Sequence, residues 1–460
     1  MNERTCVRNR HFRGCPSTFV VGVWHGLVAG TVVASVGAAV AAPFSYEDAR
    51  SALHAASDLQ AASEAALRRS EREADAADSL RLPEVSVNYT HIYGLKTGTL
   101  DTPIGALGIH EDLDGPRSSI DSTWAIYTGG QIGAAQRALA AHVDQARAEH
   151  AGTQQHLDLE LAQVYFGVVL AANVERTRTD QLQLADRHLG RALRFEQQGI
   201  VPTVERLNAQ VARDEAAREL VRAQSDRGIA QARLQRLLHA DATVEPSTPL
   251  FVITHELDEL ADWIAAAERH QPILAALDAR RQQAEQGIVL AKSVWKPTIF
   301  AFGSYSLMNK YHTIIEPDWI AGIGVNYKLV SREDRSSKVS AAQEQLQQVE
   351  SLVEESRNEI GTAVETAYRK VGQAREQFQL LESALAAASE NLRLRERGFD
   401  EAQATSLDVN DARNAVTRVE TARSLAAYEF VFALAQLLEA SGQASAFPEY
   451  IQRADQRLPP

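Results

Sequence analysis

Two aspartates, Asp408 and Asp411, stand three residues apart in the segment 406–413, which reads SLDVNDAR. Residues three apart lie on one face of a helix, so the two carboxylates point in the same direction. If several copies of the chain met around an axis, these carboxylates would converge, which would raise some of their pKa values and attract cations. Acidic residues in the first turn of a helix also act as caps and as partners of the helix dipole. The spacing alone leaves both interpretations open.

Motifs for covalent catalysis or metal binding are missing from the sequence. Gly322 and Gly324 lack the third glycine of a dinucleotide-binding motif and do not open a helix, and the chain has no phosphate-binding Gly-x-x-x-x-Gly-Lys segment. The thirteen histidines include no His-Glu-x-x-His pair, and no two carboxylates stand out as a hydrolase pair. We therefore predict that the protein is not an enzyme and has no catalytic residue, metal or cofactor.

The first 42 residues predict a secretory signal peptide. Four arginines between positions 4 and 13 precede the apolar, small-residue stretch 19–41, and the sequence AVA at 39–41 gives a cleavage pattern. Both cysteines, Cys6 and Cys15, lie inside this leader, and Cys15 precedes the apolar stretch, so it cannot be a lipidated first residue. We expect a mature chain without cysteine and therefore without disulfides, thiol nucleophiles or thiolate metal sites.

The charge balance and hydropathy limit the possible partners. The chain has 60 acidic and 47 basic residues, a net charge of −13, and loss of the arginine-rich leader makes it more negative. Such a chain repels nucleic acid. After residue 42 no continuous apolar run approaches the roughly 18 residues of a membrane-spanning helix, because the best candidate is 164–172. If the protein enters a membrane, we expect strands to carry it.

Four segments alternate between apolar and polar residues as strands do: 83–93, 120–126, 299–311 and 319–329. Segments of about ten residues with one apolar face and aromatic residues at their ends are typical of outer-membrane strands. Two amphipathic hairpins on a soluble core would show the same alternation. The aromatic residues that we predict at a membrane interface are Tyr89, Trp124, Trp295, Trp319 and Tyr327.

Four strands cannot close a barrel, because the smallest closed barrels have about eight. Lipid does not tolerate an open sheet edge. A membrane location would therefore require an oligomer to which each chain contributes four strands. The segments 94–116 and 308–318 would then be external loops.

Two long tracts without proline, 133–198 and 335–397, predict helices rich in Ala, Gln and Glu, each followed by a return helix at 203–238 or 406–438. In the first turn Gly199 can adopt the left-handed conformation that ends a helix, and Pro202 can begin the next one. The second turn has Gln403 and Thr405 instead. Tracts of this length favour coiled-coil packing.

The order of strand pair, long helix and return helix occurs twice, so that 195–210 corresponds to 399–413. A period of about two hundred residues indicates a duplicated unit and not a solenoid. We expect a first repeat in 43–254, a second repeat in 255–442 and a tail in 443–460. The proline-containing breaks after the two return helices would form a girdle around the long helices.

These features, with a helix predicted at 46–80 before the first strand, resemble the TolC-type outer-membrane efflux family. The segment 406–413 resembles the periplasmic tip of that family, where two aspartates form acidic rings at the tunnel entrance. The resemblance implies that Asp408 and Asp411 are the ring residues and that Glu205 is the acidic residue of the first hairpin turn. Phe399 and Ala404 align with the tyrosine and arginine that latch the closed entrance, and neither can make those polar contacts.

The resemblance implies a mainly α fold with membrane β: a homotrimer whose 12-stranded barrel, four strands per chain, lies in the outer membrane and continues as a long periplasmic α-helical barrel. It implies a passive channel-tunnel for efflux of drugs or small solutes, or for type I secretion of an unfolded protein. The expected partners are a periplasmic adaptor (membrane fusion protein), an inner-membrane ABC or resistance-nodulation-division transporter, and outer-membrane lipid.

A periplasmic adaptor or helical scaffold is the alternative. An adaptor normally has one helical hairpin, flanked by lipoyl-like and β-barrel domains. Two hairpins, two strand pairs and a cleavage site favour the channel.

Overall fold

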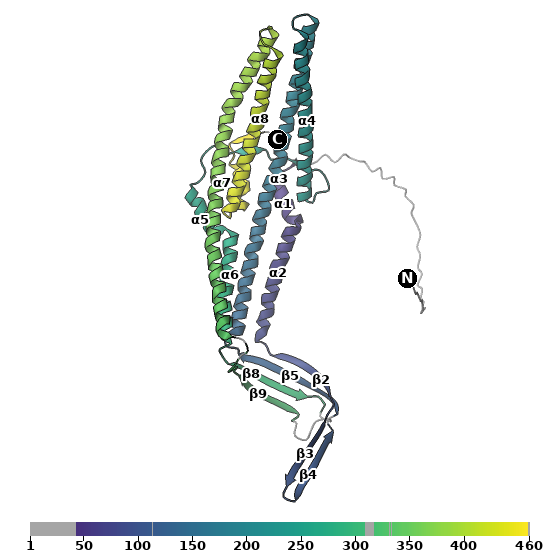
Figure 1. Ribbon diagram of the computed structural model, residues 1–460, viewed down its shortest axis with the longest axis vertical. Coiled ribbons are helices and arrows are strands. Elements are labelled where there is room, and N and C mark those ends of the chain that lie inside the picture. Colours follow the sequence, from purple (N-terminus) through teal and green to yellow (C-terminus); the bar gives the residue numbers. More distant parts are fainter. Residues whose placement is uncertain (1–42, 113, 309–316, 331, 333, 459–460) are drawn as a thin grey trace, which may run out of the picture. The chain divides into compact units, whose positions relative to one another are not determined.

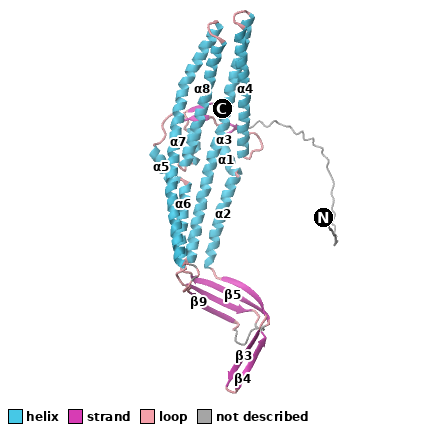
Figure 2. Cartoon of the chain, viewed as in Figure 1, coloured by secondary structure: helices cyan, strands magenta, loops and turns pink. Residues whose placement is uncertain are grey.

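The computed structural model describes residues 43–112, 114–308, 317–330, 332 and 334–458, so the predicted signal peptide lies outside the described residues. Helices dominate, and strands form one four-stranded sheet and three strand pairs (Figures 1 and 2). In chain order the elements are β1 (Pro43–Phe44), α1 (Tyr46–Ala56), α2 (Asp58–Asp78), η1 (Ser79–Arg81), β2 (Glu84–Ile92), β3 (Leu95–Thr102), β4 (Gly105–Asp112), β5 (Gly115–Tyr127), α3 (Gln131–Gln197), α4 (Thr203–Leu237), β6 (Glu245–Pro246), β7 (Leu250–Val252), α5 (Leu260–His270), α6 (Pro272–Ser293), β8 (Thr298–Ser306), β9 (Trp319–Asn326), α7 (Arg335–Asp400), α8 (Ser406–Ala440), η3 (Ala444–Ala446), α9 (Phe447–Gln452) and β10 (Gln456–Leu458).

Two helical hairpins, α3–α4 and α7–α8, pack side by side, as predicted. Near the two turns α3 packs against α4, α7 packs against α8, and both α3 and α4 contact α8; at the other end the helices follow the order α2, α3, α6, α7 (Figure 1). Helix α7 lies at one side of the helices at both ends and contacts α5 near its middle, and α2 lies at the other side next to the sheet (Figure 1). The single helix predicted at 46–80 is divided in two, because the Ser57 side chain caps the start of α2.

Aromatic side chains build the main hydrophobic core where α1, α3 and α8 meet the short strands. The rings of Tyr46, Phe166 and Phe447 contact one another at centroid distances between 5.0 and 6.0 Å. The two breaks predicted to form a girdle both reach this core, because β1 pairs with β6 and β10 pairs with β7. One 18-residue window of α3 is apolar enough to span a membrane, but 56% of it is buried inside the protein, as in the core helix of a soluble protein.

The four predicted strands form one antiparallel sheet in the order β2-β5-β8-β9, with β2 and β9 at its edges. The segment 94–116, predicted as an external loop, contains a hairpin of β3 and β4 that the sequence analysis did not predict. The alternation in that segment is interrupted by Gly, Thr and Asp, which hid the strands. Most of the second predicted loop, 309–316, lies outside the described residues.

One face of the sheet is apolar from edge to edge. The register pairs Val87 with Ile120, Ile120 with Tyr305, and Tyr305 with Trp319, so these side chains share a face, and all four are exposed in the single chain. The opposite face holds a polar cluster in which the Asn88 amide and the Ser119 hydroxyl donate to Asp121 at 2.5 and 2.7 Å.

The predicted interface aromatics fall into two rows across the sheet. Tyr89 and Trp319 lie toward the strand ends away from the long helices, whereas Trp124, Trp295 and Tyr327 lie near the helices. All five are exposed. Trp319 and Tyr327 are eight positions apart, which corresponds to roughly 26 Å of strand, close to the apolar band of about 25 Å in outer-membrane barrels.

Glycines of β9 make room for phenylalanine rings of β8. A Cβ atom at Gly322 would lie 2.9 Å from the ring of Phe302, and one at Gly324 would lie 2.5 Å from the ring of Phe300. These two glycines therefore have a packing role in the sheet.

The hydroxyl of Tyr165 connects α3 to the girdle by hydrogen bonds. It donates to the Phe44 carbonyl at 2.6 Å, and it accepts from the backbone N–H groups of Ser247 and Thr248 at 3.1 and 3.0 Å. Tyr165→Phe leaves the Thr248 N–H without its partner, whereas the Ser247 N–H still donates to the Phe44 carbonyl at 3.0 Å. We expect a loss of about 1–3 kcal/mol in the free energy of unfolding, measured by urea unfolding of the detergent-solubilised protein. Tyr327→Phe, at an exposed position, is the control, and equal effects of the two substitutions would contradict this role.

Candidate functional site at the hairpin tips

The first hairpin turn follows the prediction. Gly199 has a φ of +71°, and its N–H donates to the Glu196 carbonyl at 2.9 Å. The N–H of Ile200 donates to the Phe195 carbonyl at 2.9 Å, so the two bonds form a Schellman motif that ends α3. Pro202 then precedes the first residue of α4 in an extended conformation.

The second turn has the same hydrogen bonds without a glycine. The N–H of Ala402 donates to the Phe399 carbonyl at 3.0 Å, and that of Gln403 donates to the Gly398 carbonyl at 2.7 Å. Ala402 has a φ of +55°, a left-handed conformation that costs a residue with a Cβ about 1–2 kcal/mol. The sequence predicted a turn here but gave no signal for the residue that bears this strain.

Asp408 caps the start of α8. The Thr405 hydroxyl accepts from the Asp408 N–H at 3.2 Å, while the Asp408 carboxylate accepts from the Thr405 N–H at 3.0 Å. The N–H and the hydroxyl of Thr405, which both donate to the Asp408 carboxylate, hold the pKa of that carboxyl below its usual value, with a smaller contribution from Arg395 at 3.5 Å. The capping interpretation is therefore confirmed for Asp408. Asp411, one turn further along α8, is exposed and has no side-chain hydrogen bond or ion pair in the described part of the chain.

Glu205 joins the two hairpins. It lies in the first turn of α4, is partly buried, and accepts the backbone N–H of Ser406 at 2.6 Å. Ser406 is the first residue of α8, where a backbone donor lacks a helical partner. Glu205 thus satisfies a donor of the other hairpin and holds the two turns at the same level.

Phe399 and Ala404, which the resemblance predicted at latch positions, belong to a small hydrophobic cluster between the hairpins. Phe399 is 1% exposed, and its ring stacks on that of Phe195 of α3 at 5.8 Å. Ala404 packs against the same cluster, which also contains Val409 of α8 and Ala209 of α4. At these positions apolar packing within one chain replaces polar contacts.

Charged and titratable groups surround this cluster, and no pattern in the sequence indicated that they lie together. Arg413 is buried and lies 3.3 Å from Glu396, which also lies 3.4 Å from Arg191. His188 is buried against the Phe399 ring at 4.6 Å, and neither ring nitrogen has a hydrogen-bond partner among the described residues. Burial, with Arg413 and Arg191 nearby, lowers the pKa of His188 to about 4.

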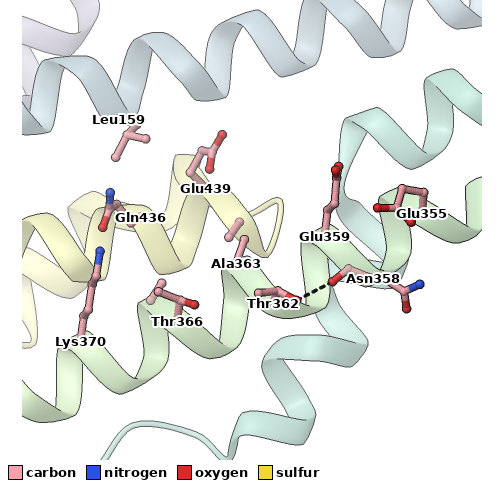
Figure 3. A pocket seen from close by; sticks show the side chains of 12 residues that line it. Leu159, Glu355, Asn358, Glu359, Thr362, Ala363, Thr366, Lys370, Gln436 and Glu439 are labelled. Atoms are coloured by element: carbon pink, nitrogen blue, oxygen red, sulfur yellow. Dashed lines mark hydrogen bonds between the residues drawn. The ribbon is translucent and has the colours of Figure 1, made fainter. Parts of the chain in front are cut away.

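A cavity of about 540 Å³ lies away from the tips, between α3, α7 and α8 (Figure 3). Glu355, Glu359 and Glu439 border it together with Lys370, and burial raises the pKa of the Glu439 carboxyl. Small residues such as Ala363 also line it. In the part of the chain that the structure describes, no three His, Cys, Asp or Glu side chains are arranged to hold a metal ion.

Two packed helical hairpins that continue into a four-stranded sheet with one apolar face define the fold of an outer-membrane channel protein. The sequence pattern of the Outer membrane efflux protein family matches residues 49–239 and 263–443, and the chain belongs to this family. The protein is accordingly an outer-membrane protein that extends into the periplasm, and the family is one of transport proteins and not of enzymes.

Individual relatives are distant. Protein CyaE of Bordetella pertussis is 25% identical over 276 residues, which is 57% of this chain and 57% of the length of CyaE. The outer-membrane channel OprN superposes with a TM-score of 0.71 at 16% identity, covering 86% of this chain and 90% of OprN. The outer membrane protein VceC of Vibrio cholerae superposes with a TM-score of 0.72 at 14% identity, covering 86% of this chain and 96% of VceC. At these identities the superpositions establish the fold.

The strain at Ala402 predicts a stabilising substitution. Ala402→Gly should raise the free energy of unfolding by about 0.5–1 kcal/mol, since glycine adopts a positive φ without a Cβ clash. Glu401→Gly, at a neighbouring residue with a φ of −93°, should lower it. Urea unfolding compares the two variants, and a destabilised Ala402→Gly variant would contradict the assignment of strain.

The buried His188 predicts a loss of stability in acid. Its pKa is about 4 in the folded chain and 6.5 without the fold, so the unfolded chain binds the additional proton first. Stability is complete above pH 6.5 and falls between pH 6.5 and 4 by on the order of 3 kcal/mol. In His188→Leu this part of the pH dependence should disappear, whereas exposed His270→Gln should retain it. Unfolding free energies at a series of pH values test the difference.

Proposed function

We propose that three copies of the chain close into a channel-tunnel with a 12-stranded barrel in the outer membrane and a helical barrel in the periplasm. The observation that carries the proposal is the sheet: one apolar face bounded by two aromatic rows, with β2 and β9 unpaired at its edges. Lipid would surround the apolar face, while β9 of one copy would pair with β2 of the next.

The same arrangement closes the helical layer. Helix α7 follows β9 on one edge, and α2 precedes β2 on the other. An interface between two different edges of one chain forms a ring when the rotation closes. Three copies of four strands give twelve, in keeping with the resemblance to TolC-type channels. The proposed repeats are residues 43–254 and 255–442, with 443–460 as a girdle segment.

The duct would be passive. Substrates, either drugs and small solutes or an unfolded secreted protein, would enter from an inner-membrane ABC or resistance-nodulation-division transporter through a periplasmic adaptor. Membership of the efflux family favours this function over that of an adaptor or scaffold.

We place the entrance at the hairpin tips. Asp411 would supply the free carboxylates of the entrance, since Asp408 is engaged by Thr405 and Arg395. Around a threefold axis these side chains would repeat in each copy and attract cations. Glu205, Phe399 and Ala404 would hold the tip together and would not act as a polar latch.

Size measurement and electrical recording test the channel. The detergent-purified protein should have the mass of a trimer and should conduct ions when reconstituted into a planar bilayer. A monomer without conductance would exclude the proposal, whereas an adaptor would give no conductance in any oligomeric state.

Neutralising the free carboxylate tests the entrance. Asp411→Asn should lower cation selectivity and weaken block by multivalent cations added from the tip side, without loss of the trimer, because exposed polar positions rarely change stability much. Glu401→Gln, an exposed carboxylate in the same turn region, is the matched control. Selectivity and block that stay unchanged in Asp411→Asn would remove this residue from the entrance.

A further inference from the structure

A second cavity, of about 610 Å³, lies on α3 near the tips, and three arginines line it. Arg187, Arg191 and Arg194 stand at positions i, i+4 and i+7, which share one face of a helix. The other lining residues are Leu184, Asp186 and Gly190 of α3 and Glu396 of α7. The volume falls within the range of small-molecule sites.

Two of the three arginines have no anionic partner. Arg187 and Arg194 are exposed, and neither side chain has a hydrogen bond or ion pair within the described part of the chain. The acidic lining residue of α3, Asp186, already accepts the Nε–H of Arg213 at 2.9 Å. The two guanidinium groups are therefore free to donate to the oxygen atoms of a ligand.

The third arginine, Arg191, shares its main partner with a buried arginine. The Oε1 atom of Glu396 accepts from Arg191 at 3.4 Å and from Arg413 at 3.3 Å, whereas a strong charge-assisted bond measures about 2.7–2.9 Å. Asp400 lies 3.6 Å from Arg191 and adds a long ion pair. The Nε atoms of both arginines are buried without a hydrogen-bond partner among the described residues. Neither guanidinium is therefore fully compensated.

The buried Arg413 shows the same shortage of negative charge. Its side chain is 3% exposed. Burial lowers the pKa of its guanidinium, Glu396 opposes this effect, and the nearby Arg191 and Arg187 add to it. Clefts that are lined by charges of one sign concentrate ions of the opposite sign. A multivalent anion is thus the ligand that this group of arginines favours.

Stabilisation of a helix end does not explain the arginines. A cation stabilises the C-terminus of a helix only within about its last turn. Helix α3 ends at Gln197, so Arg194 lies in the last turn, but Arg187 lies ten positions before the end. The exposed face that these residues share is therefore better explained by a ligand than by the helix dipole.

We propose that this cavity, the arginine pocket, binds a small soluble oxyanion with two or more negative charges, of the class of inorganic phosphate or pyrophosphate. Arg187, Arg191 and Arg194 donate to its oxygen atoms, because the planar guanidinium matches the geometry of phosphate oxygens. The pocket lies within one chain and does not depend on the proposed trimer. It also differs in sign from the proposed entrance, where Asp411 attracts cations.

A bound anion changes the balance of charge behind the pocket. It takes over part of the compensation of Arg191, so that Glu396 is left to the buried Arg413. A ligand that binds the folded chain alone also raises its stability. Occupation of the pocket therefore stabilises the packing of α3 against α8 near the tips.

Calorimetric titration and thermal unfolding of the full-length protein in a non-ionic detergent test the pocket. The probe is inorganic pyrophosphate at neutral pH, where His188 is uncharged, with sodium chloride added to keep the ionic strength constant. The test variant is Arg187→Gln with Arg194→Gln. The matched control is Arg222→Gln with Arg236→Gln, which removes the same charge at two exposed positions of α4.

The unsubstituted protein and the control should bind one pyrophosphate per chain and unfold at a higher temperature in its presence. The test variant should bind about tenfold more weakly or worse, since each lost bond to a charged group contributes on that order. Glu396→Gln, which removes the competing carboxylate, should bind more tightly and gain more in unfolding temperature than the unsubstituted protein.

Three results would overturn the arginine pocket. The first is equal pyrophosphate affinity in the test variant and the control. The second is a rise in unfolding temperature that sodium chloride alone reproduces at the same ionic strength. The third is binding of a poly-glutamate peptide without binding of pyrophosphate, which would assign the arginines to an acidic protein segment.

Discussion

An unpaired strand edge cannot remain in lipid, because its N–H and C=O groups have no partner there. This constraint decides how the rest of the molecule must be built. The sheet has two such edges, β2 and β9, and each continues into a helical edge, α2 in one case and α7 in the other. In the proposed trimer, closure of the strands by neighbouring copies would bring the helices that follow them together as well, so that the barrel and the helical layer would close through one symmetry.

The hairpin tips lie far along the helices from this closure and need their own means of alignment. Within one chain, two contacts supply the alignment. The carboxylate of Glu205 accepts the backbone N–H of Ser406 in the other hairpin, and the ring of Phe399 stacks on that of Phe195. These contacts set α3 beside α7 and α4 beside α8 at the tips.

The sequence predicted most elements because their signals are local. Alternation located all four strands of the sheet, and absence of proline located both long helices to within a few residues. Gly199 marked its turn because a positive φ favours glycine. Three features were not predicted: the β3–β4 hairpin, the break at Ser57 and the strained Ala402. Polar strands, a capping serine within a helical tract and an alanine with a positive φ have no distinctive local pattern.

The tip cluster could not be predicted for a different reason. Its members come together only when two hairpins, about two hundred residues apart in sequence, pack against each other. A capping role for Asp408 could be anticipated from its place in the first turn, but the partnership of Glu205 with Ser406 could not. The same holds for Arg413, which is an ordinary helical residue in the sequence and a buried cation in the fold.

The distribution of packing shows where the chain opens most easily. The girdle core contains several fully buried aromatic rings and a shared tyrosine hydroxyl. The tip cluster has four buried residues, two of them alanine, beside a histidine and an arginine with unpartnered nitrogen atoms among the described residues. Buried polar atoms without partners oppose the apolar contacts that surround them. Local opening therefore requires less free energy at the tips than at the girdle, which agrees with the proposal that the tips form the entrance.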